Sequence, residues 1–124
     1  MDDNEIIPLY DPDHALALVC SRRDLRDYVL SETLDYFSDG GQITALLDHR
    51  TYPDAMAQLA ELAHQATGVA RHASMPRLAA RLRAITDALD SRQCALAQDL
   101  ALALPELLAA TREQAAASLI EARE

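Results

Sequence analysis

The chain has 124 residues, of which 50% are hydrophobic and 25% charged, values that exclude a disordered chain and fit a single globular domain. Its formal net charge of -9 argues against a nucleic-acid partner, because affinity for a phosphate backbone rests on basic contacts. Alanine and leucine, both strong helix formers, dominate the composition, and no segment has the alternation of a strand. The sequence therefore predicts an all-α fold.

The first two predicted helices lie in the N-terminal third of the chain. Aspartate and proline at positions 11 and 12 supply an N-cap acceptor and a proline at the first helical position, so a short helix is expected from there to about Cys20. Residues 21–24 resemble a capping box, with an acid three positions after a serine. We expect a long second helix from this point to about Leu47, continuous through Gly40 and Gly41.

Prolines punctuate the rest of the chain. A third helix is predicted over residues 53–71, with a proline at its start. Ser74 as N-cap, followed by Pro76 in the first turn, predicts a fourth helix that ends at a short turn over residues 90–92. A fifth helix fills most of the remainder, and Pro105 should kink or divide it.

Helices of these lengths, joined by short turns, favour an antiparallel four-helix bundle with a short additional N-terminal helix. We expect residues 1–10 to form an N-terminal arm, whose Leu9 and Tyr10 could dock on one domain spanning residues 11–124. No run approaches the roughly 20 apolar positions that cross a bilayer, and no charged-then-apolar leader opens the chain. We therefore expect a cytoplasmic protein without membrane contact, and a monomer, because the helices of a bundle satisfy one another.

Motifs of the common enzyme classes are missing from the sequence. It contains no GxxxxGK or GxGxxG nucleotide loop, no HExxH and no serine between flanking glycines. The pattern ExxH occurs once, at residues 61–64, whereas di-iron bundles need it on two helices. Cys20 and Cys94 lie in apolar sequence without metal-ligand spacing and are predicted to be small buried residues. We expect no metal site and no cofactor.

Of the four histidines, His64 is the one in the middle of a predicted helix. His14 falls in a first turn, and His49 and His72 fall near helix C-termini, where the helix dipole accounts for them. Gly68 lies one turn after His64 in an alanine-rich segment, although glycine costs about 1 kcal/mol relative to alanine. The missing side chain gives a partner room to approach the imidazole. The alternative is tight packing against a neighbouring helix, with His64 an ordinary surface histidine.

A family resemblance favours the first interpretation. Residues 63–68, Ala-His-Gln-Ala-Thr-Gly, resemble the phosphorylated-histidine motif A-H-x-[LF]-[KR]-G of histidine phosphotransfer (HPt) domains. Residues 11–16 and 23–25 resemble two earlier segments of that family. Residues 75–78, Met-Pro-Arg-Leu, resemble the V-P-R-L of C-terminal HPt domains in BarA/GacS-like hybrid sensor kinases. The similarity extends from about residue 10 to about residue 108.

The motif departs from the family at two positions. The basic residue three positions after the histidine is Thr67 here, and the apolar residue two positions after it is a small alanine. All eleven basic residues are arginine, so any substitute for the missing basic residue must be an arginine. Arg71 is the local candidate, and Arg77 or Arg81 on the next helix could also contribute.

The resemblance implies a phosphorelay carrier without an ATP site, which is not an enzyme by itself. His64 would accept a phosphoryl group from the aspartate of a receiver domain, on a response regulator or a hybrid kinase, and return it to another receiver. Gln65 and Thr67 could bond the phosphoryl oxygens, Arg71 could offset their charge, and Gly68 would supply clearance. The Mg²⁺ would belong to the receiver.

Two other functions stay open. A pseudo-HPt protein would bind a kinase or receiver but transfer poorly, because Thr67 replaces the basic residue. A helical adaptor would use another surface, with His64 and Gly68 as packing details. Whether the chain is free-standing or a domain of a hybrid kinase is not decided by the sequence.

Overall fold

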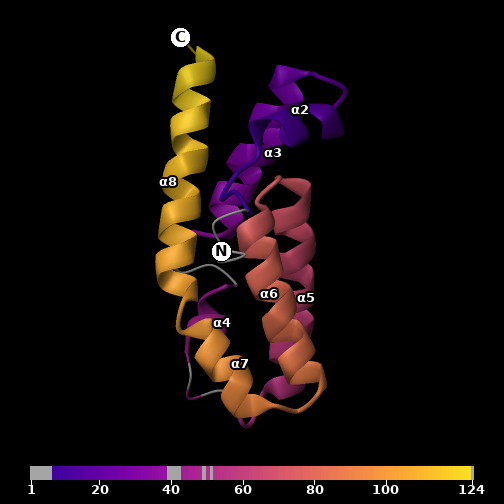
Figure 1. Cartoon of the computed structure of the whole chain (residues 1–124), viewed down its shortest axis with the longest axis vertical. Coiled ribbons are helices and arrows are strands. Elements are labelled where there is room, and N and C mark those ends of the chain that lie inside the picture. The colour runs from indigo at the N-terminus through magenta and orange to yellow at the C-terminus, as the bar shows by residue number, and fades with distance from the viewer. Residues whose placement is uncertain (1–6, 39–42, 49, 51, 124) are drawn as a thin grey trace.

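The computed structural model describes residues 7–38, 43–48, 50 and 52–123, with side chains up to residue 119 at the C-terminal end. In this part of the chain the backbone forms seven helices and no strand (Figure 1), so the all-α prediction is confirmed. The helices are α2 (Pro12–Leu18), α3 (Arg23–Tyr36), α4 (Thr44–Leu47), α5 (Met56–His72), α6 (Pro76–Asp90), α7 (Cys94–Ala101) and α8 (Leu104–Arg123).

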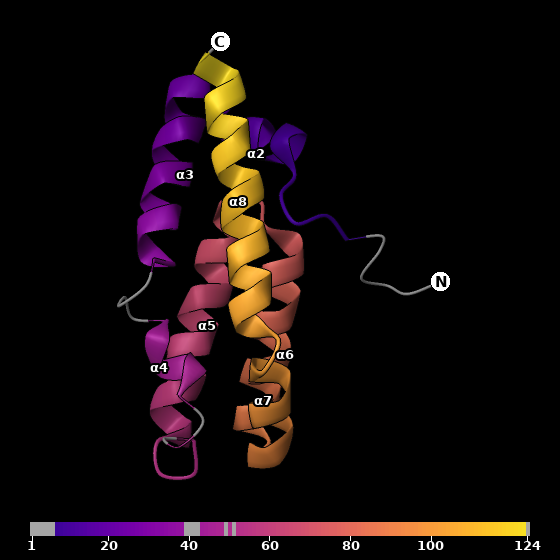
Figure 2. The same cartoon turned by 90° about the vertical axis from the view of Figure 1, so that its left-hand side faces the viewer.

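Helix α8 runs along most of the molecule, and α7, which precedes it, continues towards the end away from the C-terminus (Figures 1 and 2). The C-terminal part of α8 lies beside α3, and its N-terminal part lies beside the α5–α6 pair (Figure 2). Helix α3 also contacts α5, so the four longest helices contact one another in the order α3, α5, α6, α8 and back to α3. The short helices α4 and α7 contact α5 and α6, respectively, at the end of the molecule away from the C-terminus.

The core is centred on the seam between α5 and α6, the most extensive helix–helix contact in the described fold. Small residues of α5 meet large residues of α6 there, which lets the two helices approach closely. Each fully buried leucine or isoleucine contributes about 1.5–3 kcal/mol. The buried residues of the two helices are Leu59, Ala60, Ala63, Ala66, Thr67 and Ala70 on α5, and Leu78, Ala79, Leu82, Ile85, Thr86, Ala88 and Leu89 on α6.

The helix starts at Pro12 and Pro76 are confirmed, but both predicted serine caps are wrong. Ser21 and Ser74 have left-handed φ angles of 62° and 59°, whereas an N-cap residue is extended. Each serine instead lies in the C-terminal capping turn of the preceding helix. The Ser21 N–H donates to the Leu16 carbonyl at 2.8 Å, and the N–H after Ser74 likewise bonds the end of α5. The N-caps are therefore Arg22 and Met75.

The predicted continuous second helix is also wrong. Helix α3 ends at Tyr36, and Phe37 leaves the helical conformation to bury its ring in the core at 2% exposure. The Ser38 hydroxyl donates to the Asp35 carbonyl at 2.6 Å and so satisfies a group of the last turn. The pair Gly40–Gly41 lies outside the described residues.

The later helices begin close to their predicted positions. Helix α5 begins at Met56, three residues after the predicted proline start, and ends at His72. The predicted turn at residues 90–92 forms after α6. Pro105 becomes the second residue of α8, where its missing N–H costs nothing, and the chain bends by 40° between α7 and α8. The predicted division of this segment is confirmed.

The N-terminal arm is anchored where residues 7–10 are described. Tyr10 is buried, and the Arg77 Nε–H donates to the Ile7 carbonyl at 2.9 Å. Cys20 is exposed because it lies in the left-handed turn after α2, so its predicted burial is wrong, and Cys94 is half-buried. Within the described residues no single helix is both long and apolar enough to cross a membrane, although the bent pair α7–α8 together meets the length and composition.

Candidate functional site

A cavity of about 360 Å³ opens between α5 and α6 beside His64. The α5 wall contains four of the five residues that the sequence singled out, and the α6 wall adds four polar residues. Gln65 is exposed and is not part of the lining, because the next residue along a helix is rotated by about 100°. The lining residues are His64, Thr67, Gly68, Arg71, Arg83, Thr86, Asp87 and Asp90.

The imidazole of His64 is exposed in the middle of α5. Among the described residues, none forms a hydrogen bond or an ion pair with it. His14 differs, because its Nδ1 lies 2.9 Å from the Ser74 hydroxyl. His72 is exposed as the last residue of α5, and His49 lies outside the described residues. His64 therefore borders the cavity with an imidazole that no described residue engages.

Gly68 faces open space in the same cavity. A Cβ atom added at this position would meet no atom within 4 Å. Tight packing against a neighbouring helix, the alternative explanation for this glycine, is therefore wrong. Alanine would fit and would favour the helix by about 0.5–1 kcal/mol. The described fold gains nothing from glycine here, so the clearance beside His64 is available to another molecule.

The threonines of the cavity have already used their hydroxyl hydrogens. Thr67 is buried, at 6% exposure, and its hydroxyl donates to the Ala63 carbonyl at 2.7 Å. Thr86 on the opposite wall donates to the Leu82 carbonyl at 2.9 Å in the same way. A phosphoryl contact from Thr67, as the sequence suggested, would first require this bond to break. Strong donors in the cavity are therefore the arginines.

One arginine stands on each wall of the cavity, Arg71 on α5 and Arg83 on α6. The Arg83 Nε lies 4.0 Å from the Asp87 carboxylate, and both side chains are more than 60% exposed. An ion pair this long and this exposed contributes little stability, so Arg83 can exchange its partner at low cost. The prediction that Arg77 or Arg81 would contribute is wrong, because both line a different cavity on the other side of α6.

Sequence reasoning missed the whole α6 wall. Arg83, Thr86, Asp87 and Asp90 recur at spacings of three, one and three residues, which places them along one polar stripe of a helix. That stripe was visible in the sequence as a repeat of polar residues that flanks the leucines. Its position beside His64 was not visible, because it depends on how α5 and α6 pack.

The charged side chains of the cavity nearly balance. Its described residues do not include enough possible ligands to hold a metal ion. Two guanidinium groups face two carboxylates, those of Asp87 and Asp90. Within the described residues, no group of three or more histidine, cysteine, aspartate or glutamate side chains could hold a metal ion. An anion entering this cavity would therefore be bound by arginine, with the carboxylates displaced as competing partners.

Comparisons with protein-family models, curated proteins and solved structures found no match for this chain. The functional argument therefore rests on the motif at residues 63–68 and on the chemistry of the cavity that contains it. An exposed imidazole, an unfilled position one turn away and an arginine on each wall are the features that a function must explain.

Proposed function

We propose that this protein is a histidine phosphotransfer carrier, in which His64 accepts a phosphoryl group from the aspartyl phosphate of a receiver domain and returns it to another receiver. The observation that carries the proposal is the unpartnered imidazole of His64 beside the open space at Gly68. The closed order of contacts through α3, α5, α6 and α8 supports the antiparallel four-helix bundle that such a carrier uses. A cytoplasmic monomer with its domain over residues 11–124 is part of the same proposal.

The transfer step requires only the lone pair of one imidazole nitrogen. The Nε2 atom of neutral His64 attacks phosphorus, the acyl phosphate P–O bond breaks, and the receiver carboxylate leaves with the bond electrons. The reverse reaction with a second receiver regenerates the neutral imidazole. Such transfer depends on positioning and charge stabilisation more than on covalent work by the protein, and the Mg²⁺ is supplied by the receiver.

The two arginines would stabilise the transferred group. A phosphoryl group on His64 carries negative charge into a cavity that Arg71 and Arg83 border from opposite walls. Guanidinium groups bind phosphoryl oxygens through paired hydrogen bonds, so either residue can replace the missing basic side chain at Thr67. Arg83 must first leave Asp87, which the long and exposed ion pair permits.

Gly68 would serve docking. The receiver must bring its aspartyl phosphate into line with the His64 nitrogen, so its loops must approach the α5 surface closely. A missing side chain one turn from the histidine leaves that approach open. Gln65, exposed next to His64 but outside the cavity, is available to the docked partner.

Two features favour a pseudo-HPt protein as the second candidate. The Thr67 hydroxyl donates to the Ala63 carbonyl, and Asp87 and Asp90 place negative charge where a phosphoryl group would sit. Both features would slow transfer without preventing a receiver from binding. A helical adaptor that ignores His64 is disfavoured, because the described fold itself does not need Gly68.

The test is phosphotransfer from a radiolabelled phospho-receiver with Mg²⁺. Wild type is compared with His64→Gln and with His72→Gln, a matched control that removes another exposed histidine of the same helix. The proposal predicts acid-labile, alkali-stable label on wild type and His72→Gln, and none on His64→Gln. Receiver binding without label in wild type would replace the carrier by a pseudo-HPt protein. Absence of receiver binding would leave the helical adaptor.

A further inference from the structure

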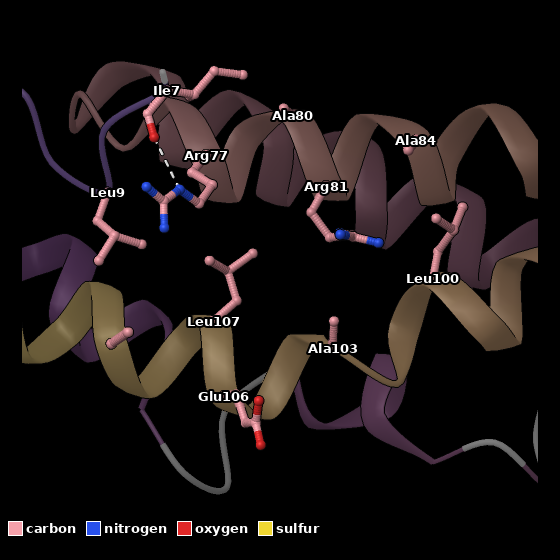
Figure 3. A pocket seen from close by; sticks show the side chains of 11 residues that line it. Ile7, Leu9, Arg77, Ala80, Arg81, Ala84, Leu100, Ala103, Glu106 and Leu107 are labelled. Atoms are coloured by element: carbon pink, nitrogen blue, oxygen red, sulfur yellow. Dashed lines mark hydrogen bonds between the residues drawn. The ribbon is translucent and has the colours of Figure 1, made fainter. Parts of the chain in front are cut away.

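A second cavity, of about 430 Å³, lies between α6 and the α7–α8 segment (Figure 3). The N-terminal arm closes one end of it through Ile7 and Leu9, and Leu100 borders it near the other end (Figure 3). This groove differs from the cavity at His64 because its walls are mainly apolar. Cavities of this volume and character are typical of small-molecule sites.

Alanines keep the groove open. Ala84 on α6 lies across the groove from Ala103, at the start of the α8 wall, and neither methyl group fills the space between the helices (Figure 3). Ala80 borders the groove as an exposed residue. Protein interiors are normally packed to high density, and leucine has nearly the same helix propensity as alanine. A leucine at Ala84 would fill the groove at small cost to either helix. The sequence instead leaves an apolar space.

Two guanidinium groups enter this apolar space from α6. Arg77 and Arg81 lie one helical turn apart, and both side chains point between α6 and α8 (Figure 3). Arg77 is engaged with the Ile7 carbonyl, whereas within the described residues neither arginine forms an ion pair. Glu106 borders the groove, but its carboxylate points away from both guanidinium groups (Figure 3). Such a site has positive charge that the described part of this acidic chain does not neutralise.

We propose that the groove binds an anionic amphiphile, a molecule with an alkyl chain and a carboxylate head. The head would pair with the Arg81 guanidinium, and the chain would lie against the alanine methyl groups and Leu107. Arg77 and Ala84 are seven helical steps apart, a length of about 10 Å, which suits an alkyl chain. A partner helix needs apolar anchors over a longer face, and the arm at Leu9 would block its path.

The proposal is tested by titrating the full chain with decanoate in a calorimeter. Decyltrimethylammonium is the control ligand, because it carries the same alkyl chain with the opposite head charge. We expect decanoate to bind, Arg81→Gln to weaken its binding at least tenfold, and Ala84→Leu to abolish it. Arg23→Gln removes the same charge at the exposed start of α3 and should leave the affinity within twofold. Decyltrimethylammonium should not bind.

Amide shifts in the NMR spectrum locate the ligand. Decanoate should move the signals of Ala84 and Leu107 and leave those of His64 and Gly68 in place. Circular dichroism establishes that each variant is folded, and Arg81→Gln keeps the test valid if Ala84→Leu does not fold. Equal binding of both amphiphiles, or unchanged decanoate affinity in Arg81→Gln, would overturn the proposal. Binding of an acidic amphipathic peptide in place of decanoate would do so as well.

Discussion

Helix α6 forms one wall of two cavities, and it contributes arginine side chains to both, in different surroundings. On the side of α5, Arg83 stands among the carboxylates of Asp87 and Asp90. On the side of α8, Arg81 stands among the methyl groups of Ala80 and Ala84. Arg83 has a long and exposed ion pair with Asp87, which it can exchange at low cost, whereas Arg81 forms no ion pair with the described residues and lies beside an apolar surface. The difference teaches that the residues around an arginine decide which anion it can bind, more than the arginine itself does.

The two cavities also differ in the helix that forms the opposite wall, which is α5 on one side of α6 and α8 on the other. Helices α5 and α6 form the most extensive helix–helix contact in the described fold, and the cavities between them lie at its surface, beside His64 and beside Ala60. Towards α8, Ala84 lies across from Ala103, with Leu100 and Leu107 on the same wall as Ala103, and the space between the helices stays open.

The largest expected effect tests that packing difference. Leu82 is fully buried in the α5–α6 seam, so Leu82→Ala should destabilise the fold by about 2–5 kcal/mol. Leu107 already borders the open groove and is half-buried, so Leu107→Ala should cost clearly less. Urea unfolding of both variants measures the difference. Equal losses would mean that the two sides of α6 are packed alike.

The next prediction distinguishes the roles of Arg81 and Arg83, which line different cavities. Arg83→Gln should lower phosphotransfer to His64 by about ten- to a hundredfold, since a hydrogen bond to a charged group contributes about 1.5–3 kcal/mol. It should leave decanoate binding unchanged, whereas Arg81→Gln should weaken decanoate binding and leave transfer unchanged. Both readouts are measured on both variants. If Arg81→Gln lost phosphotransfer and Arg83→Gln did not, the assignment of phosphotransfer to the cavity that contains Arg83 would be wrong.

A change remote from both cavities provides a reference for these effects. Burial raises the pKa of Tyr52 to about 12, and its hydroxyl donates to the Leu46 carbonyl at 2.6 Å. The folded state therefore keeps a proton that the unfolded chain loses near pH 10, so this contribution to stability is complete below pH 10 and is lost as the pH rises towards 12.

Tyr52→Phe should cost about 1 kcal/mol at neutral pH, through the lost hydrogen bond. It should also reduce the fall in stability between pH 10 and pH 12, which denaturant titrations at several pH values would measure. Burial raises the pKa of Tyr10 and Tyr36 as well, so part of the pH dependence remains. A variant with the wild-type pH profile would contradict the assignment to Tyr52.

The smallest effect concerns Gly68. Gly68→Ala should stabilise the fold by about 0.5–1 kcal/mol, because alanine is the better helix former and its Cβ meets no atom within 4 Å. The same methyl group should slow phosphotransfer from a receiver by obstructing docking. A melting curve and a transfer rate on one sample give both results. A variant that is more stable and equally fast would show that the clearance at Gly68 serves no partner.

Local signals in the sequence were sufficient for two helix starts, for the division of the last segment and for one wall of the site. Pro12 and Pro76 mark helix starts because proline is tolerated in a first turn, and Pro105 marks the predicted division between α7 and α8. Helical spacing alone brings Gly68 and Arg71 to the same face as His64. These predictions hold because they depend on the chain within a few residues.

The remaining features depend on contacts between distant segments. Arg83 reaches the cavity only through the packing of α6 on α5, and the choice of Arg77 or Arg81 failed because their face of α6 turns towards α8. The serine caps failed at Ser21 and Ser74 because the preceding helices needed a left-handed residue there. The apolar groove gave no sequence signal, because alanine is typical of any helix.

The most direct test of the central claim is to locate the phosphoryl group itself. After transfer from a phospho-receiver, the chain is digested at alkaline pH, where phosphohistidine survives, and its peptides are mapped by mass spectrometry. The account predicts phosphate on His64 and none on His14, His49 or His72. Phosphate on any of these three with His64 unmodified would contradict the account.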